Sequence, residues 1–235
     1  MNILQKLKVR AKAVLRFVGT AVEELFDRVK ERIKTWYARY KYFVEKENYI
    51  EITKDSQSDY VVNQQDKLLA DECQAYIDKA LPSGLTEALE PLSDSDRIEF
   101  VRGFVQDLSE VMGVDIHEVR FFSPSCPEEA SCLGMYDPEE KSIVLNALFI
   151  FNLEEPKATE YMTRTILHEL KHARQYAAIE GENDFGYDKD VLDTWRYNFA
   201  YYIRSEECDE AYRKQPVEVD ADGWSSLINL HAESF

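Results

Sequence analysis

The chain has 235 residues, of which 45% are hydrophobic, and its formal net charge is −17. This length can bury one sizeable core and leaves room for an appendage, and no apolar stretch reaches the roughly 20 residues that cross a bilayer. The basic N-terminus has no uninterrupted apolar core followed by a small-residue cleavage site, so we expect a cytoplasmic protein. Nucleic acid is an unfavourable partner for such an acidic chain, because phosphate binding needs clustered Lys and Arg.

The first segment differs from the rest in charge. Residues 1–46 hold 12 Lys or Arg against 5 acidic residues, whereas the remainder holds 16 against 40. Apolar residues recur at steps of three or four from Leu4 to Phe43, which predicts an amphipathic helical arm over residues 1–48 with a basic outer face. Gly19 could divide this helix in two, because a glycine costs about 1 kcal/mol in a helix interior.

Three roles are open for the apolar stripe of this arm. It can pack on the acidic body, pair with a helix of a protein partner, or make a peripheral contact with an anionic membrane through residues 1–46. The polar residues 52–59 form a predicted linker. A single domain over residues 60–235 is expected to follow it.

The pattern of this domain predicts an α+β fold, mainly helical with a small sheet. The first half should contain helices over 60–80 and from Asp94 or Ser95 to Met112, with Ser95 and Gly113 as possible caps. A strand is expected at 118–122, and a hairpin should join 134–136 to 142–145 through a polar turn. Further helical segments are predicted at 159–179, 189–213 and from Pro216 to about Leu230.

Residues 168–172 read His-Glu-Leu-Lys-His inside the helix predicted at 159–179. Positions i and i+4 share one face of a helix, so His168 and His172 can both bind one Zn²⁺ ion. Glu169 lies next to them and can act as general base toward a water that the zinc activates. The expected frequency of this motif by chance in such a chain is on the order of one in a hundred, which favours a zinc-hydrolase site.

A catalytic zinc site needs a third protein ligand and one open position. The long metzincin motif is excluded, because Gln175 and Ala178 stand where it requires Gly and His. Glu218 and Asp222 are again spaced i and i+4, on the helix expected after Pro216. We predict that Glu218 binds the metal and that Asp222 accepts a hydrogen bond from a ligand histidine, with the exchanged roles as the alternative.

These motifs resemble a known family. His-Glu-Leu-Lys-His-Ala-Arg-Gln, followed by Tyr212-x-x-Gln-Pro-x-Glu-x-Asp-Ala, is similar to the small gluzincin-type zinc metallopeptidases of bacteria and phages, and loosely to the IrrE/ImmA-like peptidases. The resemblance covers about residues 118–230 and rests on the two motifs. It implies a zincin-like fold in which the edge strand of a hairpin, here Gly134, Met135 and Tyr136, pairs with an extended peptide or protein substrate.

The residue that stabilises the oxyanion is not fixed by the sequence, and Tyr212 and Tyr136 are the candidates. The expected activity is zinc-dependent hydrolysis of peptide bonds, with Glu169 as the base. The alternative is a zincin-fold binding or scaffold protein without turnover, which the N-terminal helix recruits to a partner or a membrane surface. Glu169 favours the enzyme, because a purely structural zinc site would not need it.

Overall fold

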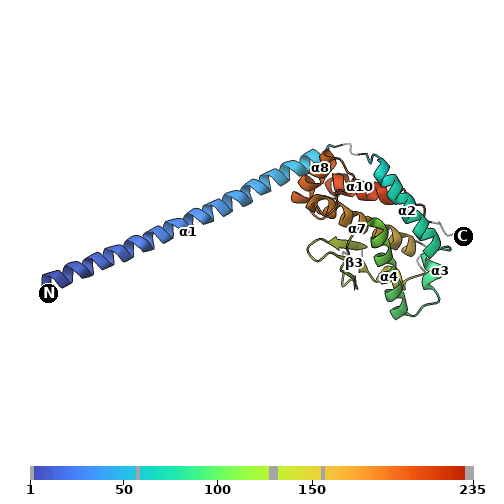
Figure 1. The fold of residues 1–235 in the computed structure, drawn as a ribbon, viewed down its shortest axis with the longest axis horizontal. Coiled ribbons are helices and arrows are strands. Elements are labelled where there is room, and N and C mark those ends of the chain that lie inside the picture. Colours follow the sequence, from blue (N-terminus) through green and yellow to red (C-terminus); the bar gives the residue numbers. More distant parts are fainter. Residues whose placement is uncertain (1–2, 57–58, 127–131, 155–156, 231–235) are drawn as a thin grey trace. The chain divides into compact units, whose positions relative to one another are not determined.

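The computed structural model describes residues 3–56, 59–126, 132–154 and 157–230, and side chains from residue 28 onward. The chain divides into two compact units, one ending at Ile52 and the other beginning at Thr53. The described part of the first unit is helical and belongs to helix α1 (Ile3–Lys54), whose last two residues are counted with the second unit. This helix is continuous through Gly19 and extends past the predicted end at residue 48 (Figure 1). The expected linker at 52–59 is therefore still helical at its start.

The described residues of the second unit are mainly helical and contain one small sheet (Figure 1). This composition agrees with the predicted α+β class. Its helices in chain order are α2 (Gln64–Ala80), α3 (Leu85–Leu89), α4 (Asp94–Met112), α6 (Leu148–Phe151), α7 (Ala158–Glu180), α8 (Lys189–Ala200), α9 (Asp209–Lys214) and α10 (Pro216–Ser225).

The sheet has three strands, β1 (Glu118–Phe122), β2 (Gly134–Asp137) and β3 (Ser142–Asn146), in the order β1-β3-β2. β1 pairs with β3 in parallel and β2 pairs with β3 in antiparallel orientation. The hairpin expected from the sequence is therefore present, and β2 is an edge strand of the sheet. It packs against α7.

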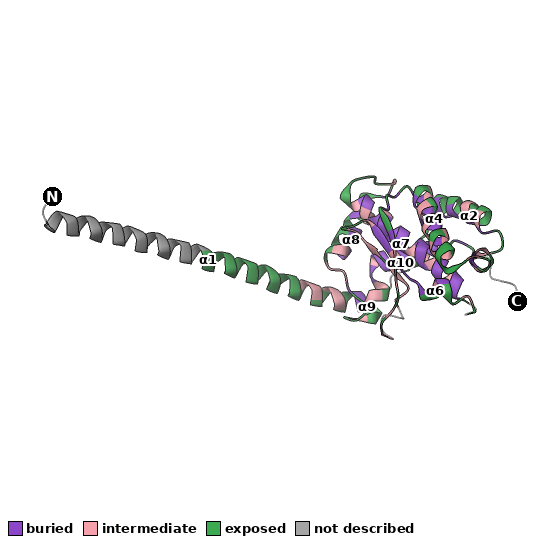
Figure 2. Ribbon diagram, turned by 90° about the horizontal axis from the view of Figure 1, so that it is seen from below, coloured by how far each residue is buried: buried purple, intermediate pink, exposed green. Residues whose placement is uncertain are grey.

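Helix α7 occupies the centre of the unit. It contacts α10, β2, α6, α8 and α4, and most of its residues are buried, as the purple segments of α7 and α10 indicate (Figure 2). Ile166, Leu167 and Leu170 are fully enclosed in the main hydrophobic core. A helix buried on so many sides provides a rigid platform for side chains that must keep a fixed geometry.

Helix α4 has the bounds that the sequence predicts, Asp94 and Met112, but a different residue caps its start. Helix α4 begins after Ser93, not Ser95, because the Ser93 hydroxyl accepts the bond from the Asp96 amide. Its other end is as predicted, with Gly113 in the left-handed conformation at φ 68°. Serine is a favoured cap at either position, and the hydrogen bond from the Asp96 amide identifies Ser93 as the cap that is used.

The last two predicted helices are shorter than the pattern indicates. The segment 189–213 is divided into α8 and α9 because the Gln215 side chain bonds both the amide and the carbonyl of Ile203 and holds that stretch in a turn. Helix α10 ends at Ser225 instead of near Leu230. None of the described helices combines the length and the apolar character that a membrane crossing requires.

Candidate metal centre

Helix α7 brings the two histidines of the motif together. His168 and His172 are one turn apart, and their ring centroids are separated by 4.6 Å at an interplanar angle of 85°. Both rings are largely buried, and Gly181, left-handed at φ 82°, ends the helix two turns beyond them. The i, i+4 spacing therefore does place both imidazoles on one face, as expected.

The carboxylate comes from the first turn of α10. Pro216 begins this helix, and the amide of Val217 donates to the Asn198 side chain, which in turn donates to Gln215. These buried bonds fix where α10 starts and hence where Glu218 lies. The Glu218 side chain is only 1% exposed and faces the two histidines of α7.

The three side chains converge on one point. His168 Nε2 and His172 Nε2 lie 3.0 Å apart, and each lies 3.2 Å from an oxygen of Glu218. Ligands that bind a tetrahedral ion at 2.0–2.1 Å are about 3.3 Å from one another, so the observed triangle is close to the size of a zinc ligand set. These three residues form a group that could hold a metal ion.

The remaining imidazole nitrogens identify the tautomers. His168 Nδ1 lies 2.8 Å from Asp222 Oδ1, and His172 Nδ1 lies 2.8 Å from Gln175 Oε1. Because both partners accept, each neutral ring carries its proton on Nδ1 and directs the lone pair of Nε2 inward. Two lone pairs and a carboxylate would then meet at one point, an arrangement that is stable only with positive charge among them, supplied either by a metal ion or by protons on the imidazoles.

The pKa shifts reflect the same electrostatics. Burial lowers the pKa of His168, but hydrogen bonds to Asp222 and Glu218 outweigh it and hold the value well above its usual range. Burial also lowers the pKa of His172, but the negative charge of Glu218 outweighs this effect and raises the pKa above its usual value. Burial raises the pKa of Glu218, but His172 and His168 more than offset this and keep that carboxyl ionised. The pocket thus strongly favours positive charge beside Glu218.

Glu169 lies beside the convergence point without belonging to it. Burial raises its pKa, while the charges of His168 and His172 oppose the rise, and the backbone of Tyr136 in β2 hydrogen-bonds to it. A carboxylate with a raised pKa is a better proton acceptor near neutral pH. Glu169 and His168 line two adjoining clefts, of about 1280 and 550 Å³, that give solvent access to the site.

The smaller cleft is bordered by the free edge of the sheet. Gly134, Met135 and Tyr136 of β2 line it opposite the residues of α7. Among the described residues, β2 is paired with β3 alone, so its other edge faces this cleft. The predicted substrate-binding strand therefore lies beside the histidines and Glu169.

The two candidate tyrosines are placed differently. Tyr212 lines both clefts, and burial together with the charges of Glu218 and Glu169 raises its pKa. The ring of Tyr136 lies 5.8 Å from that of Tyr176, and the acidic groups that raise its pKa most, after burial, are Glu180 in the last turn of α7 and Glu182 just beyond that helix. Of these two candidates, only Tyr212 has its hydroxyl in the field of Glu218 and Glu169.

Two residues of the site were not recognised in the sequence. Gln175 orients His172, and Tyr202 donates a 2.6 Å hydrogen bond to Glu218 Oε1. Gln175 lies three residues after His172 on the same helix, a spacing that could have identified it. Tyr202 follows α8 in an irregular segment, and no spacing in the sequence links it to Glu218.

Comparison with known proteins identifies no relative of this chain. No family model, no curated protein and no solved structure is found to match the chain.

Proposed function

We propose that the chain is a zinc-dependent metallopeptidase of the gluzincin type, with His168, His172 and Glu218 as metal ligands. The observation that carries the proposal is the convergence of two Nε2 lone pairs and one carboxylate at mutual distances of 3.0–3.2 Å. Two nitrogens and one oxygen are a ligand set typical of catalytic zinc, which keeps a fourth position open. The hydrogen bonds on both Nδ1 atoms support the same assignment.

Zinc held by these residues would supply Lewis-acid chemistry, lowering the pKa of a bound water toward about 7 and polarising a peptide carbonyl. Glu169 would accept the proton of the attacking water and return it to the leaving amine. Its buried position and raised pKa suit both transfers. The Tyr212 hydroxyl would donate to the carbonyl oxygen as negative charge develops there.

The substrate would bind as an extended peptide along the free edge of β2. Main-chain pairing to an exposed strand supplies affinity with little dependence on sequence, which suits an enzyme that cleaves the backbone. We propose on this basis that the unit has a zincin-like arrangement. The packing of β2 against α7 and the lining of the smaller cleft by Met135 and Tyr136 support it.

Metal analysis combined with a cleavage assay tests the proposal. The purified chain should hold one zinc ion and cleave members of a peptide library, and a chelator should abolish cleavage until zinc is restored. Glu169→Gln should keep the zinc and lose cleavage, whereas His168→Ala should lose both. Zinc at full occupancy with no cleavage by the wild-type chain would indicate the non-catalytic binding protein instead, and absence of zinc would reject the site.

A further inference from the structure

Helix α1 presents an exposed apolar stripe. At 3.6 residues per turn, seven side chains between residues 29 and 44 fall within an arc of about 120°. Trp36 and Phe43 are 65% and 62% exposed, and the ring of Trp36 stacks on Tyr40 with centroids 5.6 Å apart. The seven are Val29, Ile33, Trp36, Tyr37, Tyr40, Phe43 and Val44. An apolar face of this kind marks an interaction surface.

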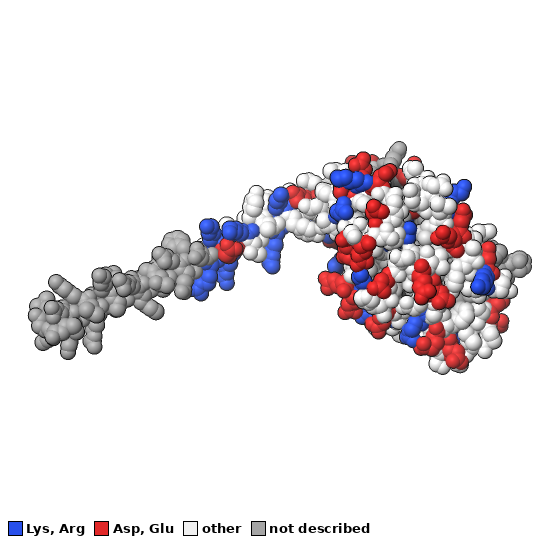
Figure 3. Space-filling view, in the orientation of Figure 1, with Lys and Arg blue, Asp and Glu red and all other residues white. Residues whose placement is uncertain are grey.

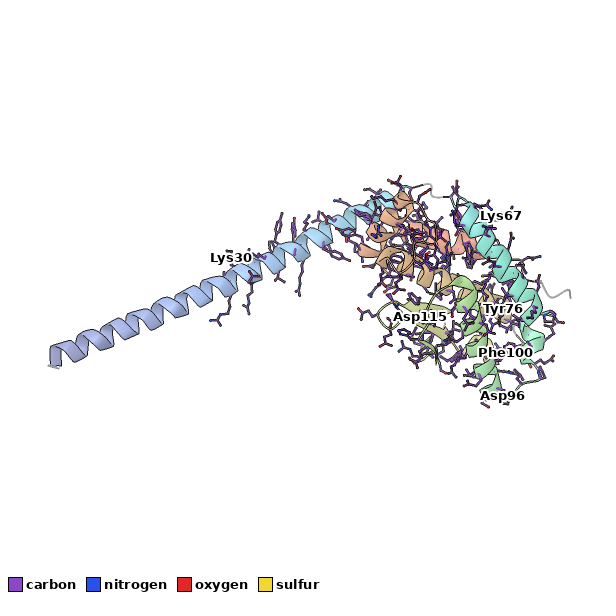
Figure 4. All side chains as sticks on the ribbon, viewed as in Figure 1. Lys30, Lys67, Tyr76, Asp96, Phe100 and Asp115 are labelled. Atoms are coloured by element: carbon purple, nitrogen blue, oxygen red, sulfur yellow. The ribbon has the colours of Figure 1, made fainter. Side chains whose placement is uncertain are left out.

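Basic side chains border this stripe on both sides. On the helical projection one flank consists of arginines and a lysine and the other of lysines alone, which Figure 3 shows as blue groups along the described part of α1. Lys30, labelled in Figure 4, projects outward from the helix. The flanks are Arg28, Arg32, Arg39 and Lys46 on one side and Lys30, Lys34 and Lys41 on the other.

The acidic residues of the same stretch lie on the opposite face. Glu31 and Glu45 are the two carboxylates between residues 28 and 46, and both project away from the stripe. They pair with the outer lysines, Glu31 with Lys34 at 2.7 Å and Glu45 with Lys41 at 3.5 Å. The surface that meets a partner is therefore apolar in the middle and cationic at both borders.

A second copy of this helix is a poor occupant of the stripe. If Val29, Trp36 and Phe43 are taken as d positions of a heptad, the g positions are Arg32, Arg39 and Lys46, and the e positions hold no acidic residue. Paired coiled-coil helices normally match opposite charges at e and g. Two copies would instead align rows of like charge without neutralising them.

We propose that α1 lies in the surface of an anionic lipid bilayer, with the stripe inserted at the boundary between headgroups and acyl chains. Trp and Tyr favour this boundary, and Lys and Arg at the edges of an apolar face can extend their charged ends to lipid phosphates while their stems remain among apolar groups. The apolar centre, the cationic borders and the position of Glu31 and Glu45 away from the stripe all fit such a surface. This inference is independent of the proposed peptidase activity.

Flotation of the full chain with lipid vesicles tests the proposal. Vesicles with about a third phosphatidylserine should bind the chain at least about tenfold more strongly than phosphatidylcholine vesicles, and high salt should remove most of that difference. The triple variant Trp36→Ser, Tyr40→Ser, Phe43→Ser should lose binding. Arg32→Gln combined with Arg39→Gln should weaken binding to anionic vesicles and leave the weak binding to neutral vesicles unchanged.

The matched control is Glu31→Gln combined with Glu45→Gln, on the face directed away from the lipid. It should bind as strongly as wild type, and circular dichroism should show that all variants keep their helix content. The proposal is overturned if wild type does not float, or if the triple variant floats as well as wild type. Self-association in sedimentation that the triple variant abolishes, without flotation of wild type, would assign the stripe to a second copy.

Discussion

Gln175 Oε1 lies 2.8 Å from His172 Nδ1, while Nε2 of the same amide donates to the Val217 carbonyl and to Asp220 Oδ2. The amide is fully buried, so each of its bonds is made to protein. It therefore connects a candidate ligand on α7 to the first turn of α10, the helix that carries Glu218. The orientation of His172 depends on how these two helices pack.

Replacing the Gln175 amide, the acceptor for His172, should weaken metal binding more than replacing Asp222, the acceptor for His168. Gln175→Met leaves His172 Nδ1 without an acceptor in a buried site, and we expect the dissociation constant for zinc to rise about 10–100-fold. Asp222→Asn should have a smaller effect, because the Asp222 side chain is exposed and water can take its place. Competition with a chromophoric chelator measures both constants. An effect of Gln175→Met no larger than that of Asp222→Asn would contradict the proposed role.

The sequence predicted the parts of the site that depend on helical spacing. The pairs His168 and His172, and Glu218 and Asp222, are each one turn apart on their helices, and two motifs sufficed to bring them into one hypothesis. Tyr202 was not identified from the sequence, because tertiary packing places it beside Glu218 and no helical or strand spacing along the chain predicts that contact. The same limit applies to the fold. The division between α8 and α9 comes from bonds between Gln215 and Ile203, twelve residues apart.

A buried charge cluster beside the site should be important for stability. Lys171 is fully buried, and its Nζ lies 2.5 Å from Asp66 Oδ1, 2.9 Å from the Tyr187 hydroxyl and 3.3 Å from Asp220 Oδ2. Lys171→Met would leave Asp66 as a buried carboxylate without its cation. We expect the free energy of unfolding, measured in urea, to fall by about 3–5 kcal/mol.

The charge cluster offers two checks. Adding Asp66→Asn to Lys171→Met should restore part of the lost stability, because the uncompensated charge is then removed. Lys189→Met breaks an ion pair with Asp193 on the surface and should leave stability unchanged. A loss for Lys171→Met as small as that for Lys189→Met would show that the buried cluster does not act as described.

The edge strand depends on a glycine for its approach to α7. A Cβ atom at Gly134 would lie 2.8 Å from Thr165 Cγ2 and 3.1 Å from the Val144 carbonyl oxygen, and the backbone oxygen cannot move aside easily. Gly134→Ala should therefore lower the free energy of unfolding by about 1–3 kcal/mol. Since it displaces β2 from the cleft, it should also raise KM for peptide substrates in the cleavage assay.

The control for this substitution is Gly103→Ala in α4. A Cβ atom there meets nothing within 4 Å, and alanine is the better helix former, so this variant should be as stable as wild type or about 1 kcal/mol more stable. If Gly134→Ala has the stability and the KM of wild type, β2 can shift without consequence. That result would count against a role of β2 in substrate binding.

Removing each hydroxyl in turn distinguishes the roles of Tyr212 and Tyr136, the two candidates for stabilising the oxyanion. Tyr212→Phe removes a hydroxyl donor whose pKa is raised first by burial and second by the charge of Glu218, which places it beside the candidate centre. We expect kcat to fall about 100-fold while the overall structure is kept. Tyr136→Phe should leave kcat close to wild type, because that hydroxyl lies in the field of Glu180 and Glu182 instead. The backbone of Tyr136, which hydrogen-bonds to Glu169, is unaffected by the substitution.

Zinc content must be measured with each tyrosine variant, because Tyr212 and Tyr202 both hydrogen-bond to Glu218. Tyr202→Phe frees one carboxylate oxygen in a buried site and should weaken zinc retention. A fall in kcat for Tyr212→Phe at full zinc occupancy would identify a donor to the reacting carbonyl. A fall that disappears when zinc is added in excess would instead assign Tyr212, like Tyr202, to holding the carboxylate in place.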